Sequence, residues 1–81
     1  MTLTTRVLTY LRKRNTWTPT DHLYRIAQNH GYHTLAIRDA LDTIRNTCNI
    51  GYLYEKGYRW YDIPQEEQER MLAARAWFNS V

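Results

Sequence analysis

The feature that most constrains the fold of this chain is a change of pattern near Asn49. Before this point apolar residues recur at helical spacing, whereas residues 50–61 hold five aromatic side chains and the β-branched Ile50. Glu55, Lys56 and Gly57 separate two short runs within that segment, and a glycine there can adopt the positive φ that a tight turn requires. We therefore predict a β-hairpin that follows a set of helices.

A hairpin of two strands is only marginally stable in water. We therefore expect the segment around Trp17 to add a short third strand, and the sheet to pack on the helices through Leu53 and Trp60. The alternation of residues leaves open which of the tyrosines face the helices.

The first helix is predicted over residues 2–14. Leu3, Val7, Tyr10 and Leu11 follow the i, i+4, i+7, i+8 spacing that places them on one helical face. This spacing indicates an amphipathic helix with one side in the core.

The second helix is predicted to begin near Pro19 and to end at Gly31. Thr18 can cap it with a hydroxyl, Pro19 is tolerated in the first turn, and Asp21 stands three residues after Thr18, as in a capping box. Gly31 readily adopts the left-handed conformation that ends many helices. The residues expected to be buried are Leu23, Ile26 and Ala27.

The third helix is predicted to run from a cap at Thr34 to about Thr47. Ile37, Ala40, Leu41 and Ile44 form its apolar side. Cys48 lies near that side and is expected to be a small buried apolar group.

The fourth helix is predicted from the segment Asp62, Ile63, Pro64 and Gln65 to about Asn79, because a cap acid, an early proline and a glutamine occur there in helix-starting order. The fold class is therefore mainly α with a small β-hairpin, an α+β domain. A three-helix core with its hairpin occupies residues 1–63, and the additional helix occupies residues 64–81.

This order of elements in residues 1–63 resembles the winged helix-turn-helix superfamily. The residues that carry the resemblance are the opening of the second helix at 18–23, Ile37, Leu41 and Ile44 in the third, and Gly51 with Gly57 through Trp60 in the hairpin. In that family the third helix usually enters the DNA major groove, and the hairpin, or wing, touches phosphate or the minor groove. The resemblance implies a small DNA-binding protein, a transcriptional regulator or accessory factor. The small size of the chain leads us to expect a bacterial or phage origin.

The residues that would contact double-stranded DNA fall into three groups. The third helix would offer Thr34, Arg38, Arg45 and Asn46 to the major groove. The hairpin would offer Lys56 and Arg59. The first helix would offer Arg6, Arg12, Lys13 and Arg14 to the phosphate backbone, although cations at the end of a helix also stabilise the helix dipole without any ligand.

The outward face of the third helix favours an alternative function. At about 100° per residue it carries Leu35, Asp39, Asp42 and Asn46, and the two acids would be repelled by phosphates. Asp39 and Asp42 could instead contact a protein. The alternative is therefore a winged-helix interaction module, an inhibitor or adaptor of a larger nucleic-acid machine that does not bind DNA by itself.

The last helix is apolar on several sides, with Leu72 and Ala76 on one side and Trp77 on another. One side can cover the core, and the rest could pair with the same helix of a second subunit, which would give a homodimer with two DNA-binding units. The other interpretation is an intramolecular cap folded over the first helix.

Composition narrows the remaining classes of function. The net charge of +3 is compatible with an anionic partner but is too low for coating nucleic acid through charge alone. The single Cys48 allows no intrachain disulfide, and no stretch has the length of a signal peptide or membrane span, so we expect a cytoplasmic protein with no membrane partner. The histidines and Cys48 do not form a metal motif, and no catalytic set is present, so we expect no metal, no cofactor and no enzyme activity.

Overall fold

The first helix, α1, spans Leu3–Arg14 in the computed structural model, which describes the backbone of residues 1–80 and the side chains of residues 1–77. The Thr2 hydroxyl accepts a hydrogen bond from the Thr5 N–H at 3.2 Å and caps the helix. Val7 and Leu11 are buried. The helix ends where Asn15 adopts a left-handed conformation, with a φ of 50°. The predicted first helix and its apolar face are confirmed.

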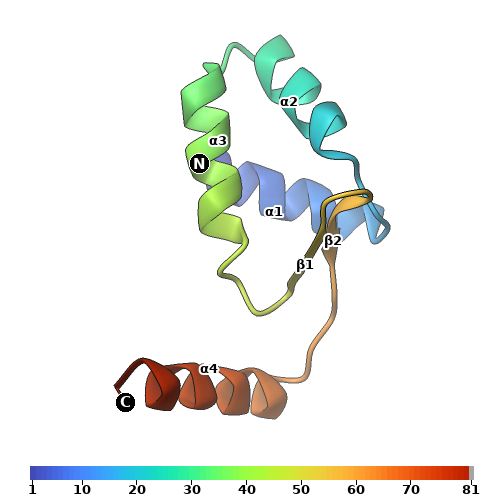
Figure 1. Cartoon of the computed structure of the whole chain (residues 1–81). Coiled ribbons are helices and arrows are strands. Elements are labelled where there is room, and N and C mark those ends of the chain that lie inside the picture. The colour runs from blue at the N-terminus through green and yellow to red at the C-terminus, as the bar shows by residue number, and fades with distance from the viewer. Residues whose placement is uncertain (81) are drawn as a thin grey trace.

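Helices α2, Thr20–Asn29, and α3, Thr34–Ile44, form a pair joined by a short turn (Figure 1). Gly31 in that turn has a φ of 88°, as its predicted role required. The core-facing residues of the pair are Leu23, Ala27, Ile37, Ala40, Leu41 and Ile44. Ile26 is only partly buried.

Three local predictions around these helices were wrong. Thr18 does not cap α2, because it is fully buried and its backbone pairs with the hairpin. His33 rather than Thr34 caps α3, since its Nδ1 accepts from the Leu35 N–H at 3.2 Å. The helix ends at Ile44, so Cys48 lies in the following turn and is only partly buried.

The hairpin consists of β1, Ile50–Leu53, and β2, Gly57–Trp60, which pair antiparallel with Tyr52 opposite Tyr58. A third segment joins it at one point. Thr18 and Tyr58 exchange two backbone hydrogen bonds, of 2.8 and 2.9 Å. The expected third strand is therefore a single bridge beside β2.

Tyr58 is the buried residue through which the hairpin packs on the helices. Its side chain is 3% exposed, whereas Leu53 is 49% exposed, so the prediction that Leu53 faces the core was wrong. The register explains the difference, because alternate residues of a strand face opposite sides and Leu53 shares the outer side with Gly51. Trp60 is partly buried against the core, as predicted.

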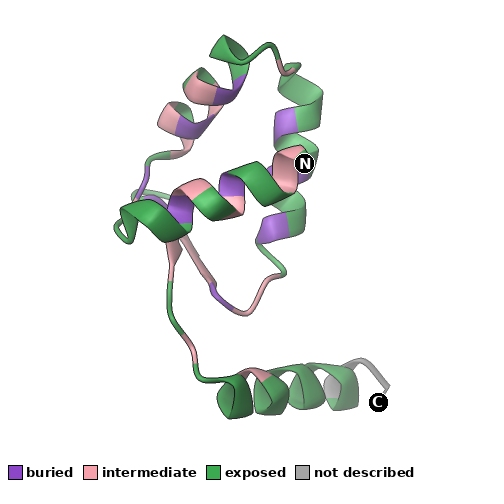
Figure 2. Ribbon diagram, turned by 180° about the vertical axis from the view of Figure 1, so that it is seen from behind, coloured by how far each residue is buried: buried purple, intermediate pink, exposed green. Residues whose placement is uncertain are grey.

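The chain is thus an α+β protein with four helices and one two-stranded antiparallel hairpin in its described part. Helix α1 crosses behind the other elements and packs against α3 and β2, while α2 packs against α3 (Figure 1). Figure 2 shows buried positions on α1, α2 and α3, whereas the described part of α4 is almost entirely exposed.

Helix α4, Gln65–Ser80, lies apart from this core at the end of an extended connection (Figures 1 and 2). From residue 65 to residue 77 only Gln68 is partly buried, and its side chain donates to the Ile63 carbonyl at 2.8 Å. The helix reaches the core through Arg75, which donates to the Asn46 carbonyl at 2.7 Å. The predicted fourth helix is present, but it does not fold over α1.

Candidate nucleic-acid interface

The outward face of α3 is exposed along its length, including Leu35, Arg38, Asp39 and Asp42. Arg38 makes no ion pair with any residue in the described part of the chain. Thr34 is also exposed, and its hydroxyl accepts from the Gln28 side chain at 3.2 Å. The amino-terminal half of α3 is therefore accessible.

The other two predicted contacts on this side, Arg45 and Asn46, are engaged within the chain. The Arg45 guanidinium lies 3.8 Å from the centre of the Tyr52 ring and 4.0 Å from the Asp42 carboxylate. The side-chain amide of Asn46 donates to the Asp42 backbone carbonyl at 3.4 Å, and the backbone carbonyl of Asn46 accepts from Arg75. With Asp39 and Asp42 balancing Arg38 and Arg45, the α3 face has no net positive charge.

Five of the other predicted cations lie at the end of α1 and on the hairpin. Helix α1 ends with Arg12, Lys13 and Arg14, all exposed. The chain then passes directly into the Thr18 bridge with β2, the strand that carries Arg59, and Lys56 lies in the turn before it. We call these five cations, Arg12, Lys13, Arg14, Lys56 and Arg59, the basic end. In Figure 1 this end of α1 lies beside the hairpin and away from α3.

Aromatic rings hold the cations of the basic end. The Arg59 guanidinium lies 5.0 Å from the Tyr61 ring centre, the Lys56 ammonium 5.8 Å from Trp17, and the Arg12 guanidinium 5.5 Å from Trp60. A cation over a ring face keeps its charge and gains about 0.5–1 kcal/mol at an exposed site. The pairs therefore order these side chains without neutralising them.

Arg14 is held in the same way by its own helix. Its guanidinium lies 5.8 Å from the Tyr10 ring and donates to the Tyr10 hydroxyl at 3.3 Å, while that hydroxyl is 2.9 Å from Nε2 of His22. Lys13 has no comparable contact among the described residues. Four of the five cations at the basic end thus rest on an aromatic ring.

The outer face of the sheet positions Arg59 in particular. Tyr61 packs edge-on against Trp17, with ring centres 6.3 Å apart, and Gly51 leaves the room that the Tyr61 ring occupies. The Nε of Arg59 is buried and finds no hydrogen-bond partner in the described part of the chain.

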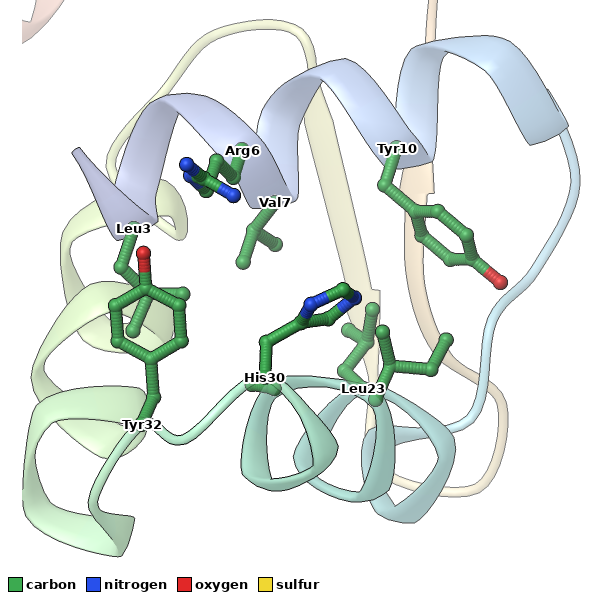
Figure 3. Close-up of a pocket in the computed structure, with 9 residues that line it drawn as sticks. Leu3, Arg6, Val7, Tyr10, Leu23, His30 and Tyr32 are labelled. Atoms are coloured by element: carbon green, nitrogen blue, oxygen red, sulfur yellow. The ribbon is translucent and has the colours of Figure 1, made fainter. Parts of the chain in front are cut away.

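Arg6 lies elsewhere, at an apolar groove between α1 and α2. The groove has a volume of about 160 Å³ and is lined mainly by aliphatic side chains, with Arg6, His30 and Tyr32 at its edge (Figure 3). Arg6 is therefore separate from the basic end, although both are carried by α1.

The ten predicted DNA contacts thus divide among three places. The basic end holds five of them, α3 and the residues after it hold Thr34, Arg38, Arg45 and Asn46, and Arg6 lies at the groove. Sequence reasoning missed the rings of Trp17, Trp60 and Tyr61 as supports of the cations. Only the alternation of Arg59 and Tyr61 along one strand could have indicated one of these pairs.

The residues predicted for a protein interface are also exposed. Asp39 and Asp42 lie on α3, and Leu72, Ala76 and Trp77 lie on α4. Leu72 is 52% exposed, which is high for a leucine in a small domain.

Metal-binding and membrane-spanning features are absent from the described residues. No group of histidine, cysteine and acidic side chains is arranged to hold a metal ion within residues 1–80. No helix in the same part of the chain is both long enough and apolar enough to cross a bilayer. Comparisons of the chain with models of known protein families, with curated proteins and with solved structures returned no match.

Proposed function

We propose that this chain is a small winged-helix protein that binds duplex DNA, as a transcriptional regulator or accessory factor, and that the basic end is its main contact surface. The order of elements supports the fold assignment, since a helix is followed by the Thr18 bridge, two further helices and a hairpin, with the bridge beside the second hairpin strand. This is the connectivity expected of a winged helix.

The observation that carries the proposal is the ordering of cations on aromatic rings at the basic end. Five cations and three carboxylates, Asp21, Glu55 and Asp62, lie in this region, whereas the charges of the α3 face cancel. A stacked guanidinium still presents its N–H edges to a phosphate, and it loses little conformational freedom when it binds. Phosphate contacts position a protein on DNA, while base contacts specify sequence.

This assignment implies a division of labour on the DNA. The basic end would hold the phosphate backbone, and the accessible half of α3, with Thr34 and Arg38, would supply the base contacts available to this chain. Because only Arg38 of these is charged and unpaired, we expect sequence preference to be modest relative to non-specific affinity.

The test is fluorescence anisotropy with a mixed-sequence duplex at about 50 and 200 mM salt. Five phosphate contacts predict a log–log slope of affinity on salt of about −4 to −5, because each contact contributes about −0.9. A slope near zero, or no binding at the lower salt, would contradict the proposal.

A matched pair of variants locates the surface. Lys13 and Arg25 are both exposed helix residues, and Lys13 lies at the basic end whereas Arg25 lies on the outer side of α2. Lys13→Ala should reduce the slope by about one unit, and so should Lys56→Ala, while Arg25→Ala should leave it unchanged. Equal effects of Lys13→Ala and Arg25→Ala would exclude the basic end as the contact surface.

A second candidate function is supported by the exposed carboxylates of α3. Asp39 and Asp42 lie with Leu35 on a face that carries no net positive charge, and Leu35 is 53% exposed. An apolar residue flanked by acids fits a basic protein partner better than a phosphate backbone. On this proposal the chain is an adaptor or inhibitor of a larger nucleic-acid machine.

A further inference from the structure

Helix α4 leaves apolar surface exposed that its own core does not cover. Leu72 is 52% exposed and Met71 is 38% exposed. The contacts described above between α4 and the rest of the chain are hydrogen bonds of Gln68 and Arg75, which do not cover these apolar side chains. An isolated helix of 16 residues is only marginally stable in water. A surface that covers the apolar side of α4 would stabilise it.

One side of α4 is continuous and suited to docking. At about 100° per residue, Gln65, Glu69, Leu72 and Ala76 fall on one ridge, at the i, i+4, i+7, i+11 spacing, and all four are exposed. Arg75, which contacts Asn46, projects from a different side. The ridge therefore combines an apolar centre with a carboxylate beside it.

The core offers a complementary surface in the groove between α1 and α2. Leu3, Val7 and Leu23 line its apolar floor, and Arg6 and His30 extend over it from opposite sides (Figure 3). An apolar groove edged by a cation matches an apolar ridge edged by Glu69. Arg6 has no salt bridge within the described part of the chain.

The α4 helix of the same chain does not lie at this groove. Tyr32, at the groove, precedes α3, whereas Asn46, the contact of α4, follows it. Helix α3 has 11 residues and is therefore about 16 Å long. Figure 1 shows α4 at the far end of the molecule from α2.

We propose that the groove between α1 and α2 receives α4 of a second copy of this chain, so that Leu72 enters the apolar floor and Glu69 pairs with Arg6. Each chain carries one ridge and one groove. In a closed twofold dimer the ridge of each chain occupies the groove of the other, so two identical contacts form. The groove shares only Tyr10 with the supports of the basic end, and none of the five cations lines it, so the dimer would present two DNA-binding surfaces. The proposal does not depend on DNA binding.

The first test is the oligomeric state of the full chain by sedimentation equilibrium over a wide range of concentration. Ala76 lies on the ridge and Ala74 on the opposite side of the helix, and both are exposed. Ala76→Asp places a carboxylate in the apolar contact and should raise the dimer dissociation constant at least about tenfold. Ala74→Asp has the same cost to the helix and should change it by less than about threefold.

The second test reverses the proposed ion pair. Arg6→Glu alone should weaken the dimer about tenfold, and Arg6→Glu combined with Glu69→Arg should restore it to within about threefold of the parent. Circular dichroism of each variant checks that the helices are retained. A chain that is monomeric at every concentration overturns the proposal, and so does a dimer that Ala76→Asp and Ala74→Asp weaken equally.

Failure of this proposal is distinguishable from failure of the DNA-binding proposal. A monomer that binds duplex with a steep salt dependence overturns the dimer alone. A dimer that does not bind duplex DNA at low salt overturns the DNA-binding proposal alone.

Discussion

Gly57 passes so close to Thr18 that a side chain at residue 57 would overlap the Thr18 backbone. The glycine also has a φ of 91°, a conformation that other residues adopt at a cost. The bridge that ties the segment after α1 to β2 therefore requires glycine at this position for two independent reasons.

Gly57→Ala should accordingly lower the free energy of unfolding by about 2–5 kcal/mol, from the left-handed backbone and the overlap together. Gly31 is the control, because it has a φ of 88° but no atom lies within 4 Å of the position that an added methyl group would occupy. Gly31→Ala should cost only about 1–2 kcal/mol. Urea denaturation of both variants measures the difference, and equal losses would show that close packing at Thr18 contributes nothing.

Because the Arg45 guanidinium stacks on the Tyr52 ring, we expect Arg45 to stabilise the folded protein rather than to bind DNA. Arg45→Ala should lower the free energy of unfolding by about 0.5–1 kcal/mol, because the pair is partly exposed. Arg38→Ala, at an exposed site on the same helix, should change it by less than about 0.5 kcal/mol. Thermal unfolding and duplex anisotropy together check this, and a large loss of DNA affinity in Arg45→Ala would reverse the assignment.

Tyr58 predicts a loss of stability at alkaline pH. Burial raises the pKa of its phenol above the ordinary value of 10.0, and the nearby Arg45 offsets the rise in part. Because the folded state binds this proton more tightly than the unfolded state, the stabilisation is complete below pH 10 and is lost as the pH rises through the folded pKa.

Tyr58→Phe should therefore flatten the dependence of the free energy of unfolding on pH above 10, as measured by denaturant titrations at several alkaline pH values. Tyr54→Phe is the matched control, since Tyr54 is 90% exposed. A Tyr58→Phe profile parallel to that of the parent protein would show that another group dominates alkaline unfolding.

The acidic residues of α3 distinguish the two proposed functions. Replacing Asp39 and Asp42 by arginine should strengthen non-specific duplex binding and steepen the salt slope by up to about two units if the chain binds DNA through or near this helix. If α3 instead binds a basic protein, the same change should abolish capture of that partner and leave duplex binding weak.

Arg38→Ala tests base recognition on the same helix. It should reduce the ratio of specific to random duplex affinity if Arg38 reads a base, and should affect both affinities alike if it contacts only phosphate. Competition anisotropy with a selected and a random duplex measures the ratio.

The helices and the hairpin could be predicted from the chain because each has a local signal. Leu3, Val7 and Leu11 repeat at the helical period, and Gly31 and Gly57 stand where the backbone has positive φ. The errors arose where a local signal competed with tertiary pairing. Thr18 has a hydroxyl that could cap α2. Its backbone instead exchanges two hydrogen bonds with Tyr58, and the residue is buried and does not cap the helix.

The candidate interface was predictable in its residue types and not in its grouping. Arg12, Lys56 and Arg59 were recognised as possible phosphate contacts, but so were Arg45 and Arg6, which the fold places elsewhere. The spacing of residues along a helix or strand predicts which side of that element a residue occupies. It does not predict which other element packs against that side.

The order of elements, the buried faces of α1 and α3, and the helix after Pro64 all follow from local signals in the chain. Only the packed fold brings the Trp60 ring beneath Arg12, 48 residues away along the chain, and holds α4 apart from the core. The difference arises from how far along the chain each interaction acts. Capping, backbone preference and amphipathic spacing act within a few residues, whereas a ring beneath a guanidinium, or an unfilled groove, exists only after distant segments have packed together.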